Sequence, residues 1–147
     1  MTPRQPWCLR FLSSTLWVCS MLILLSPAKS LNFDSPLPAL PSNAPRFYEE
    51  TQELVSQLQN LDSSALQALM HLSPKLAELN CQRYQSYDES LEAGRPALCT
   101  FTGDVYQGMD LDAWTETEYQ QAEQQIRILS GLYGVLSPLD RIQAHRL

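Results

Sequence analysis

The apolar run from Met21 to Leu25 stops abruptly at Ser26-Pro27, and this short block sets the first element of the fold. Its uninterrupted apolar character is typical of a strand that is fully buried in a parallel or mixed sheet. Proline cannot donate to a strand ladder, so the strand is predicted to end before Pro27. Lys29 then lies on the loop just past the strand's carboxyl end, where open α/β sheets usually bind ligands. A solvated loop lysine is the alternative.

The same run also fits the middle of a secretory signal peptide. Two arginines would form a basic n-region, residues 11–25 are mostly apolar, and residues 28–30 resemble a cleavage site. The stretch is too short, and too often interrupted by Ser and Thr, for a membrane span. Residues 1–20 are therefore either a leader or sequence that precedes a true start at Met21. The first interpretation predicts a secreted protein and the second a cytoplasmic one.

Charge and cysteine spacing exclude several classes of protein. With Arg4 and Arg10 set aside, 8 basic side chains accompany all 16 acidic ones, which gives residues 21–147 a net charge of −8. Such an acidic surface does not by itself favour nucleic-acid binding, because the duplex is a polyanion. Cys81 and Cys99 show no CxxC spacing and no paired histidines nearby, so we expect reduced thiols and no metal or cofactor.

The middle of the chain predicts helices joined to short strands. Four prolines among residues 34–45 indicate an extended surface connector. Helical spacing, Ser/Thr/Asp caps and glycine breaks then predict the following elements: helices at 47–61, at 65–72 after the cap 62–64, and from Ser73-Pro74; a strand at 97–101; a loop at 103–108; and a helix from Thr115 through Leu129 to a C-cap at Gly131. We expect a mixed α/β fold, with a short central sheet and an amphipathic helical lobe.

Two glycine-containing segments are candidates for chemistry. Asp104, after Gly103, is a possible catalytic carboxylate, or it simply caps its own turn. Residues 130–136 place Gly131 and Gly134 three apart after an amphipathic stretch. This spacing suits a helix-hairpin-helix turn that offers backbone N–H groups to phosphate. It also suits a tight helix-to-strand connection in which glycine supplies a positive φ, and the lack of flanking lysines favours that second interpretation.

Taken together, the motifs resemble one family. SPAKSL at 26–31, KLAELN at 75–80, FTGDVYQG at 101–108 and LSGLYGVLSPLD at 129–140 occur in the order found in the YaaA peroxide-stress family. The resemblance spans 21–147. Family members start at the methionine matching Met21 and are cytosolic, which favours the cytoplasmic interpretation of the leader. One departure is Ala144-His145, where the family tends to have Pro-Tyr.

The resemblance implies a response to hydrogen peroxide that limits damage linked to free iron. It also implies a helix-hairpin-helix element and, for the full-length form, duplex DNA as a partner. The family continues past Leu147 with much of its Lys-rich sequence, so 21–147 is expected to be the N-terminal portion of a single truncated domain. The carried-over motif residues are Ser26, Pro27, Lys29, Gly103, Asp104, Tyr106, Gly131, Tyr133, Gly134, Pro138 and Asp140.

These patterns lead to ranked hypotheses. The first is a non-enzymatic, cytosolic oxidative-stress protein that acts through nucleic-acid or iron-related protection, with Gly131, Tyr133 and Gly134 as candidate DNA-binding residues. The second is an enzyme with a pocket at the strand ends that uses Lys29 and Asp104, and the third is a secreted helical binding module. We expect three segments to converge in space: the SPAK loop (26–29), the GDVY loop (103–106) and the GLYG turn (131–134). Lys29 and Asp104 would then face one cleft.

Overall fold

A computed structural model of the chain describes residues 21–37 and 39–146. The predictions for residues 1–20 lie outside the described residues. The helical elements are α1 (Tyr48–Gln59), α2 (Ser63–Met70), α3 (Pro74–Gln85), α4 (Ala97–Thr100), α5 (Asp104–Gln107), the 3-10 turn η1 (Leu111–Ala113) and α6 (Glu116–Gln125). The strands are β1 (Ile23–Leu25), β2 (Ser30–Leu31), β3 (Arg95–Pro96), β4 (Phe101–Thr102), β5 (Ile126–Ser130), β6 (Gly134–Leu136) and β7 (Arg141–Ile142).

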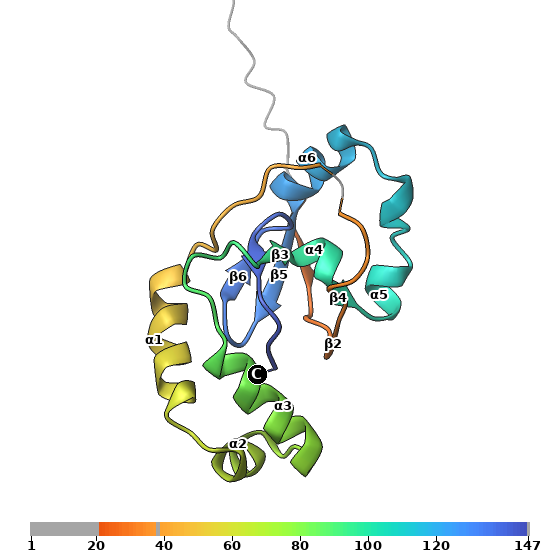
Figure 1. Cartoon of the computed structure of the whole chain (residues 1–147). Coiled ribbons are helices and arrows are strands. Elements are labelled where there is room, and N and C mark those ends of the chain that lie inside the picture. Colours follow the sequence, from red (N-terminus) through yellow and green to blue (C-terminus); the bar gives the residue numbers. More distant parts are fainter. Residues whose placement is uncertain (1–20, 38, 147) are drawn as a thin grey trace, which may run out of the picture.

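The predicted mixed α/β class is confirmed. The largest sheet in the described residues has the order β1-β5-β6, with β1 parallel to β5 and β5 antiparallel to β6. Two small antiparallel pairs, β2–β4 and β3–β7, lie beside it. Figure 1 shows α1, α2 and α3 grouped as a lobe at one end, with α4, α5 and α6 on the other side of the strands.

The predicted first strand exists and pairs in parallel, but the prediction that it is fully buried was wrong. β1 lies at the edge of its sheet, and Leu22 and Leu24 are largely exposed. The register sets Ile23 opposite Ile126 and Leu25 opposite Ile128. Ile126 and Ile128 are both buried. Because strand side chains alternate between faces, Leu24 must point to the opposite, uncovered face.

The helical lobe follows its sequence signals. α2 begins where Asp62 accepts a hydrogen bond from the Ala65 amide at 2.8 Å. α3 begins where Ser73 accepts one from Leu76, with Pro74 at the first helical position. Both caps satisfy amide groups that have no partner within the helix, which is why short polar residues mark these starts in the sequence.

Three local predictions between residues 97 and 131 were wrong. Residues 97–100 form the helical turn α4 instead of a strand, and residues 104–107 form the short helix α5 instead of a loop. α6 starts at the predicted cap Thr115, which forms a capping box with Glu118, but it ends at Gln125 rather than at Gly131. Ile126 turns to extended backbone because it pairs with Ile23, so tertiary pairing overrides the helical spacing there.

The described residues of the proline-rich connector are extended, as predicted, and hydrogen bonds hold the connector near both ends. The backbone amide of Asn43 donates to the Leu139 carbonyl at 3.0 Å, and the backbone carbonyl of Asn43 accepts from the Arg141 amide at 2.8 Å. The guanidinium of Arg95 donates to the carbonyl groups of Phe33 and Ser35. The connector is thereby tied to both β3 and β7.

The turn between β5 and β6 depends on the glycine at position 134. Gly134 has φ +70°, and a Cβ there would lie 3.0 Å from the Phe47 ring. We expect Gly134→Ala to lower the free energy of unfolding by about 1–2 kcal/mol, since it adds both backbone strain and a steric contact. Urea unfolding followed by circular dichroism measures the loss.

Gly103→Ala is the control for this prediction. Gly103 has extended backbone, and a Cβ there would meet Ala28 at an ordinary 3.5 Å. An equal loss in the two variants would contradict a specific need for positive φ at position 134.

Candidate functional site

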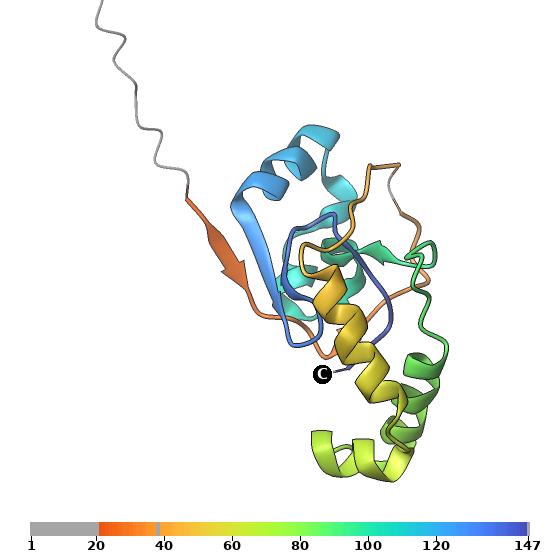
Figure 2. The ribbon, with the colours of Figure 1, turned by 90° about the vertical axis from the view of Figure 1, so that its left-hand side faces the viewer.

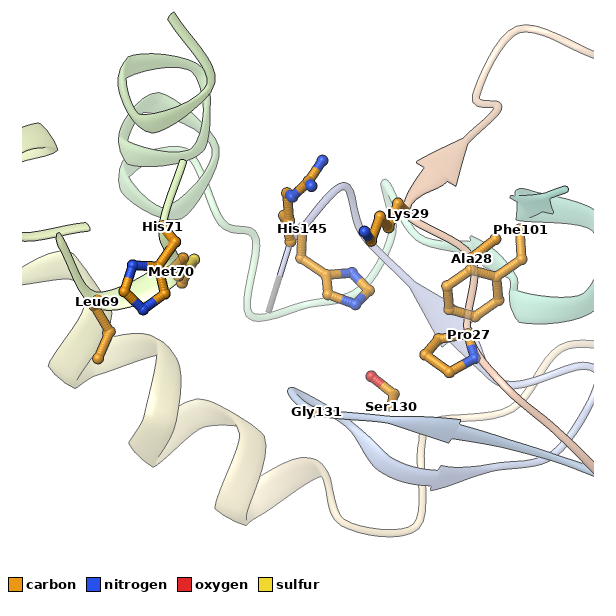
Figure 3. Close-up of a pocket in the computed structure, with 11 residues that line it drawn as sticks. Pro27, Ala28, Lys29, Leu69, Met70, His71, Phe101, Ser130, Gly131 and His145 are labelled. Carbon is orange, nitrogen blue, oxygen red and sulfur yellow. The ribbon is translucent and has the colours of Figure 1, made fainter. Parts of the chain in front are cut away.

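A cleft of about 690 Å³ lies where the parallel strands β1 and β5 reach their carboxyl ends. Figure 3 shows it between the SPAK loop and the end of α2, with His145 in the middle. Its position matches the strand-end location predicted for Lys29. The lining residues are Pro27, Ala28, Lys29, Leu69, Met70, His71, Phe101, Ser130, Gly131, His145 and Arg146.

The first wall of the cleft is the SPAK loop, and the GDVY segment holds it in place. The Tyr106 hydroxyl donates to the Ser26 carbonyl at 2.7 Å. β2 pairs with β4, setting Ser30 opposite Thr102, and Gly103 packs close to Ala28. These two motifs therefore converge, as predicted, but GDVY supports the wall from behind.

The second wall is the tip of the β5–β6 hairpin, which corrects the interpretation of the GLYG motif. Residues 126–136 form strand, turn and strand, so the motif is neither a helix-hairpin-helix turn nor a helix-to-strand connection. Tyr133 is completely buried, and Gly134 packs against Phe47. Of the three residues predicted to bind DNA, only Gly131 lines the cleft.

The third wall comes from the C-terminal segment, which the sequence did not single out for this role. The Tyr84 hydroxyl donates to the Arg146 carbonyl at 2.7 Å and fixes the backbone there. The ring of His145 packs edge-on against Tyr133, with centroids 5.0 Å apart, and also meets Phe101. Arg146 is thus placed beside the cleft by aromatic packing and one buried hydroxyl.

His145 is a neutral side chain in this wall. Burial lowers the pKa of its imidazole, and nearby Arg83 lowers it further, while the Gln143 carbonyl opposes the shift. Nδ1 lies 2.8 Å from that carbonyl, which can only accept, so Nδ1 carries the proton. Nε2 of the neutral ring is then an acceptor.

The cleft is lined by two cationic side chains and by no acidic one. Its lining includes Lys29 and Arg146, the exposed His71, and no Asp or Glu. This contrasts with residues 21–147 as a whole, in which acidic side chains outnumber basic ones two to one. A local site of this kind can bind an anion, because charge close to the ligand counts far more than screened charge elsewhere.

Asp104 is not among the residues that line the cleft. It begins α5, one residue beyond the glycine that touches the SPAK loop, and its side chain is exposed. The cleft therefore holds Lys29 without the carboxylate predicted to accompany it. The structure replaces that pair with Lys29, His71 and Arg146, and no sequence spacing links these three residues.

Pro138 and Asp140 are buried parts of the framework away from the cleft. One carboxylate oxygen of Asp140 accepts from the Ser137 amide at 2.8 Å. Desolvation raises the pKa of Asp140 to about 6, and Glu123 adds to this, while the Ser137 amide and Arg127 oppose it. The SPLD sequence thus closes a turn.

Other chemistries find less support in the described residues. Within 21–37 and 39–146, no three His, Cys, Asp or Glu side chains form a group that could hold a metal ion. Cys81 and Cys99 are free thiols, and burial raises the pKa of Cys99. None of the helices in this part of the chain has the length and apolar character to span a bilayer.

The fold and cleft define a class: a small mixed α/β protein with a basic cleft at its strand ends. Comparison with known proteins identifies the family. The family model described as "Peroxide stress protein YaaA" matches residues 21–147, so the chain belongs to this family.

Several curated relatives carry the name UPF0246 protein. One from Clostridium beijerinckii is 47% identical over 127 residues, which is 86% of this chain and 49% of the relative. Relatives from Delftia acidovorans and Alcanivorax borkumensis are 47% and 41% identical, and each match covers 86% of this chain and 50% of the relative. The chain thus spans about half the length of the curated relatives it matches.

The raised pKa of Asp140 predicts a pH-dependent effect of Asp140→Asn. The amide keeps an acceptor for Ser137 but has no charge to bury. In the parent, the stability that Asp140 contributes is greatest below the unfolded pKa of about 4 and is lost as the pH rises through about 6. The variant should therefore gain stability relative to the parent between pH 4 and pH 7.5, as measured by urea unfolding.

His145 titrates in the opposite direction, but it is present in both proteins, so their difference isolates Asp140. A difference in unfolding free energy that stays constant from pH 4 to pH 7.5 would contradict the assignment.

Proposed function

We propose that this protein acts in the defence against hydrogen peroxide by binding nucleic-acid phosphate in the strand-end cleft. Membership of the peroxide-stress family supports the general role. The observation that carries the binding proposal is the convergence of Lys29 and Arg146 on one cleft without an acidic lining residue. Binding would hold the protein at the nucleic acid that peroxide and iron damage.

The chemistry of the lining fits a phosphate ester. Lys29 supplies a mobile ammonium group, and Arg146 a planar guanidinium that can donate two parallel hydrogen bonds to phosphate oxygens. The Ser130 hydroxyl and the exposed Gly131 add polar groups and close backbone approach. Leu69, Met70 and Phe101 give the cleft an apolar side suited to a sugar or a base edge.

The size of the cleft limits how nucleic acid can enter it. A volume of about 690 Å³ lies in the range of small-molecule sites, so it accommodates a unit of nucleotide size but not a duplex. Duplex DNA would therefore present one or two backbone phosphates at the mouth. Contacts of this kind carry no sequence information and weaken steeply with salt.

Lys29→Ala should weaken the binding of a short duplex several-fold. It should also reduce the salt dependence, with the slope of log K against log salt becoming shallower by about 0.9, because one phosphate contact is lost. Fluorescence anisotropy of a labelled duplex at several salt concentrations measures both quantities, and a labelled single strand shows which form is preferred.

Lys75→Ala is the matched control. Lys75 is also an exposed lysine, but it lies at the start of α3 and does not line the cleft. If the two variants bind equally, the cleft is not the phosphate site. If the parent chain shows no salt-dependent binding to either nucleic acid, the chain does not bind nucleic acid.

The compartment that fits this role is the cytoplasm, with translation starting at Met21. Cleavage near Ser30 would remove β1, which pairs with β5, together with Lys29 of the cleft wall. Fractionation of expressing cells, followed by N-terminal sequencing, is expected to find a cytoplasmic protein that begins at Met21. An exported form that begins near Leu31 would overturn this proposal.

An enzymatic role is the second candidate, because the cleft lies at the carboxyl ends of parallel strands. Lys29 and neutral His145 would then be its titratable groups, without Asp104. This alternative requires turnover of a small phosphorylated substrate.

A further inference from the structure

The sheet β1-β5-β6 has one face that no described element covers. Its core side carries Ile126, Ile128 and Leu136, all buried. Its other side exposes large apolar side chains, with exposed fractions of 59% for Leu24, 43% for Leu129 and 38% for Val135. Figure 2 shows β1 at the margin of the described part of the molecule, with no other described strand or helix beyond it.

The strand register shows that these side chains share one surface. Leu129 is paired with Val135 across β5 and β6, and paired residues point to the same side. Leu24 is paired with Arg127, which lies two residues before Leu129 and so faces the same way. Leu22 precedes Leu24 by two residues and is also exposed. We call Leu22, Leu24, Leu129 and Val135 the outer face.

An uncovered apolar surface is unusual for this kind of sheet. Sheets made of parallel strands are almost always covered on both faces, because their strands are apolar on both sides, and β1 and β5 form a parallel pair. β1 also has a free edge, which leaves backbone groups available for another strand. The outer face therefore has the character of the inside of a larger domain.

We propose that the outer face is the surface on which the other half of a full-length family protein packs. The relatives that this chain matches are about twice as long as the matched part, so about half of each relative lies outside the match. Apolar side chains of that portion would cover Leu24, Leu129 and Val135. This proposal does not depend on nucleic-acid binding.

The position of the outer face connects it to the cleft. A shallow hollow on this side is lined by Leu129 and Val135, and also by Pro27, Ser130 and Gly131. The last three residues line the cleft as well. A polypeptide seated on the outer face would therefore extend along one wall of the cleft and narrow its mouth.

The test places the same substitution in two contexts. In this chain, Leu129→Lys should shift the urea midpoint little, because the side chain is already exposed. In the intact Clostridium beijerinckii relative, lysine at the position aligned with Leu129 should lower the midpoint by about 1 M or more, since a charge would be buried. Leu79→Lys is the matched control, because Leu79 is 40% exposed but lies on α3.

Hydrogen exchange provides a second measurement should the relative's variant fail to fold. Amides of residues 22–25 should exchange much more slowly in the unsubstituted relative than in this chain, because they are covered there. Equal exchange in the two proteins, or equal midpoint shifts for the Leu129 and Leu79 positions in the relative, would overturn the proposal. A dimer of this chain that Leu129→Lys dissociates would also overturn it, by assigning the face to a second copy.

Discussion

The segment from Ser137 to Arg146 is hydrogen-bonded to the proline-rich connector, α3, α4 and α6, and the cleft depends on how it is held. The amides of Ala97 and Leu98, at the start of α4, donate to the carbonyl groups of Asp140 and Pro138 at 2.8 and 3.0 Å. The Gln143 side chain bonds both backbone groups of Asp88. Since little of the segment is regular strand or helix, its backbone groups need these partners to be buried at low cost.

The same segment explains why an imidazole can occupy a cleft wall without adding charge. Position 145, where the family resemblance leads one to expect tyrosine, lies between the rings of Tyr133 and Phe101. An aromatic ring of either type fills this space edge-on. Burial keeps His145 neutral, so the positive charge at the cleft comes from Lys29 and Arg146.

Local signals in the sequence predicted the helical lobe well. Features that depend on contacts between distant parts of the chain were missed. Caps at Asp62, Ser73 and Thr115 are visible because a cap is made by residues three apart. The end of α6 at Gln125 was not visible, because it is set by the pairing of Ile126 with β1, about a hundred residues earlier. For the same reason, only one of the two cations of the cleft could be predicted from the sequence. Lys29 lies shortly after the end of β1 in the sequence. Arg146, in contrast, is held at the cleft by a hydrogen bond from the Tyr84 hydroxyl on α3, which no local pattern reveals.

The motif residues divide into two groups, and this division bears on the proposed binding of an anion by an acidic chain. Tyr133, Pro138 and Asp140 are buried and shape the framework, while Pro27, Lys29 and Gly131 reach the cleft. At physiological salt, charges are screened over roughly 8 Å, so most of the acidic surface acts weakly on a ligand there. In the proposed site, exposed Lys29 and half-buried Arg146 would act on a bound phosphate at short range, where charge is screened least. For the proposed phosphate site, net charge would therefore govern long-range approach, and the placement of Lys29 and Arg146 would govern binding.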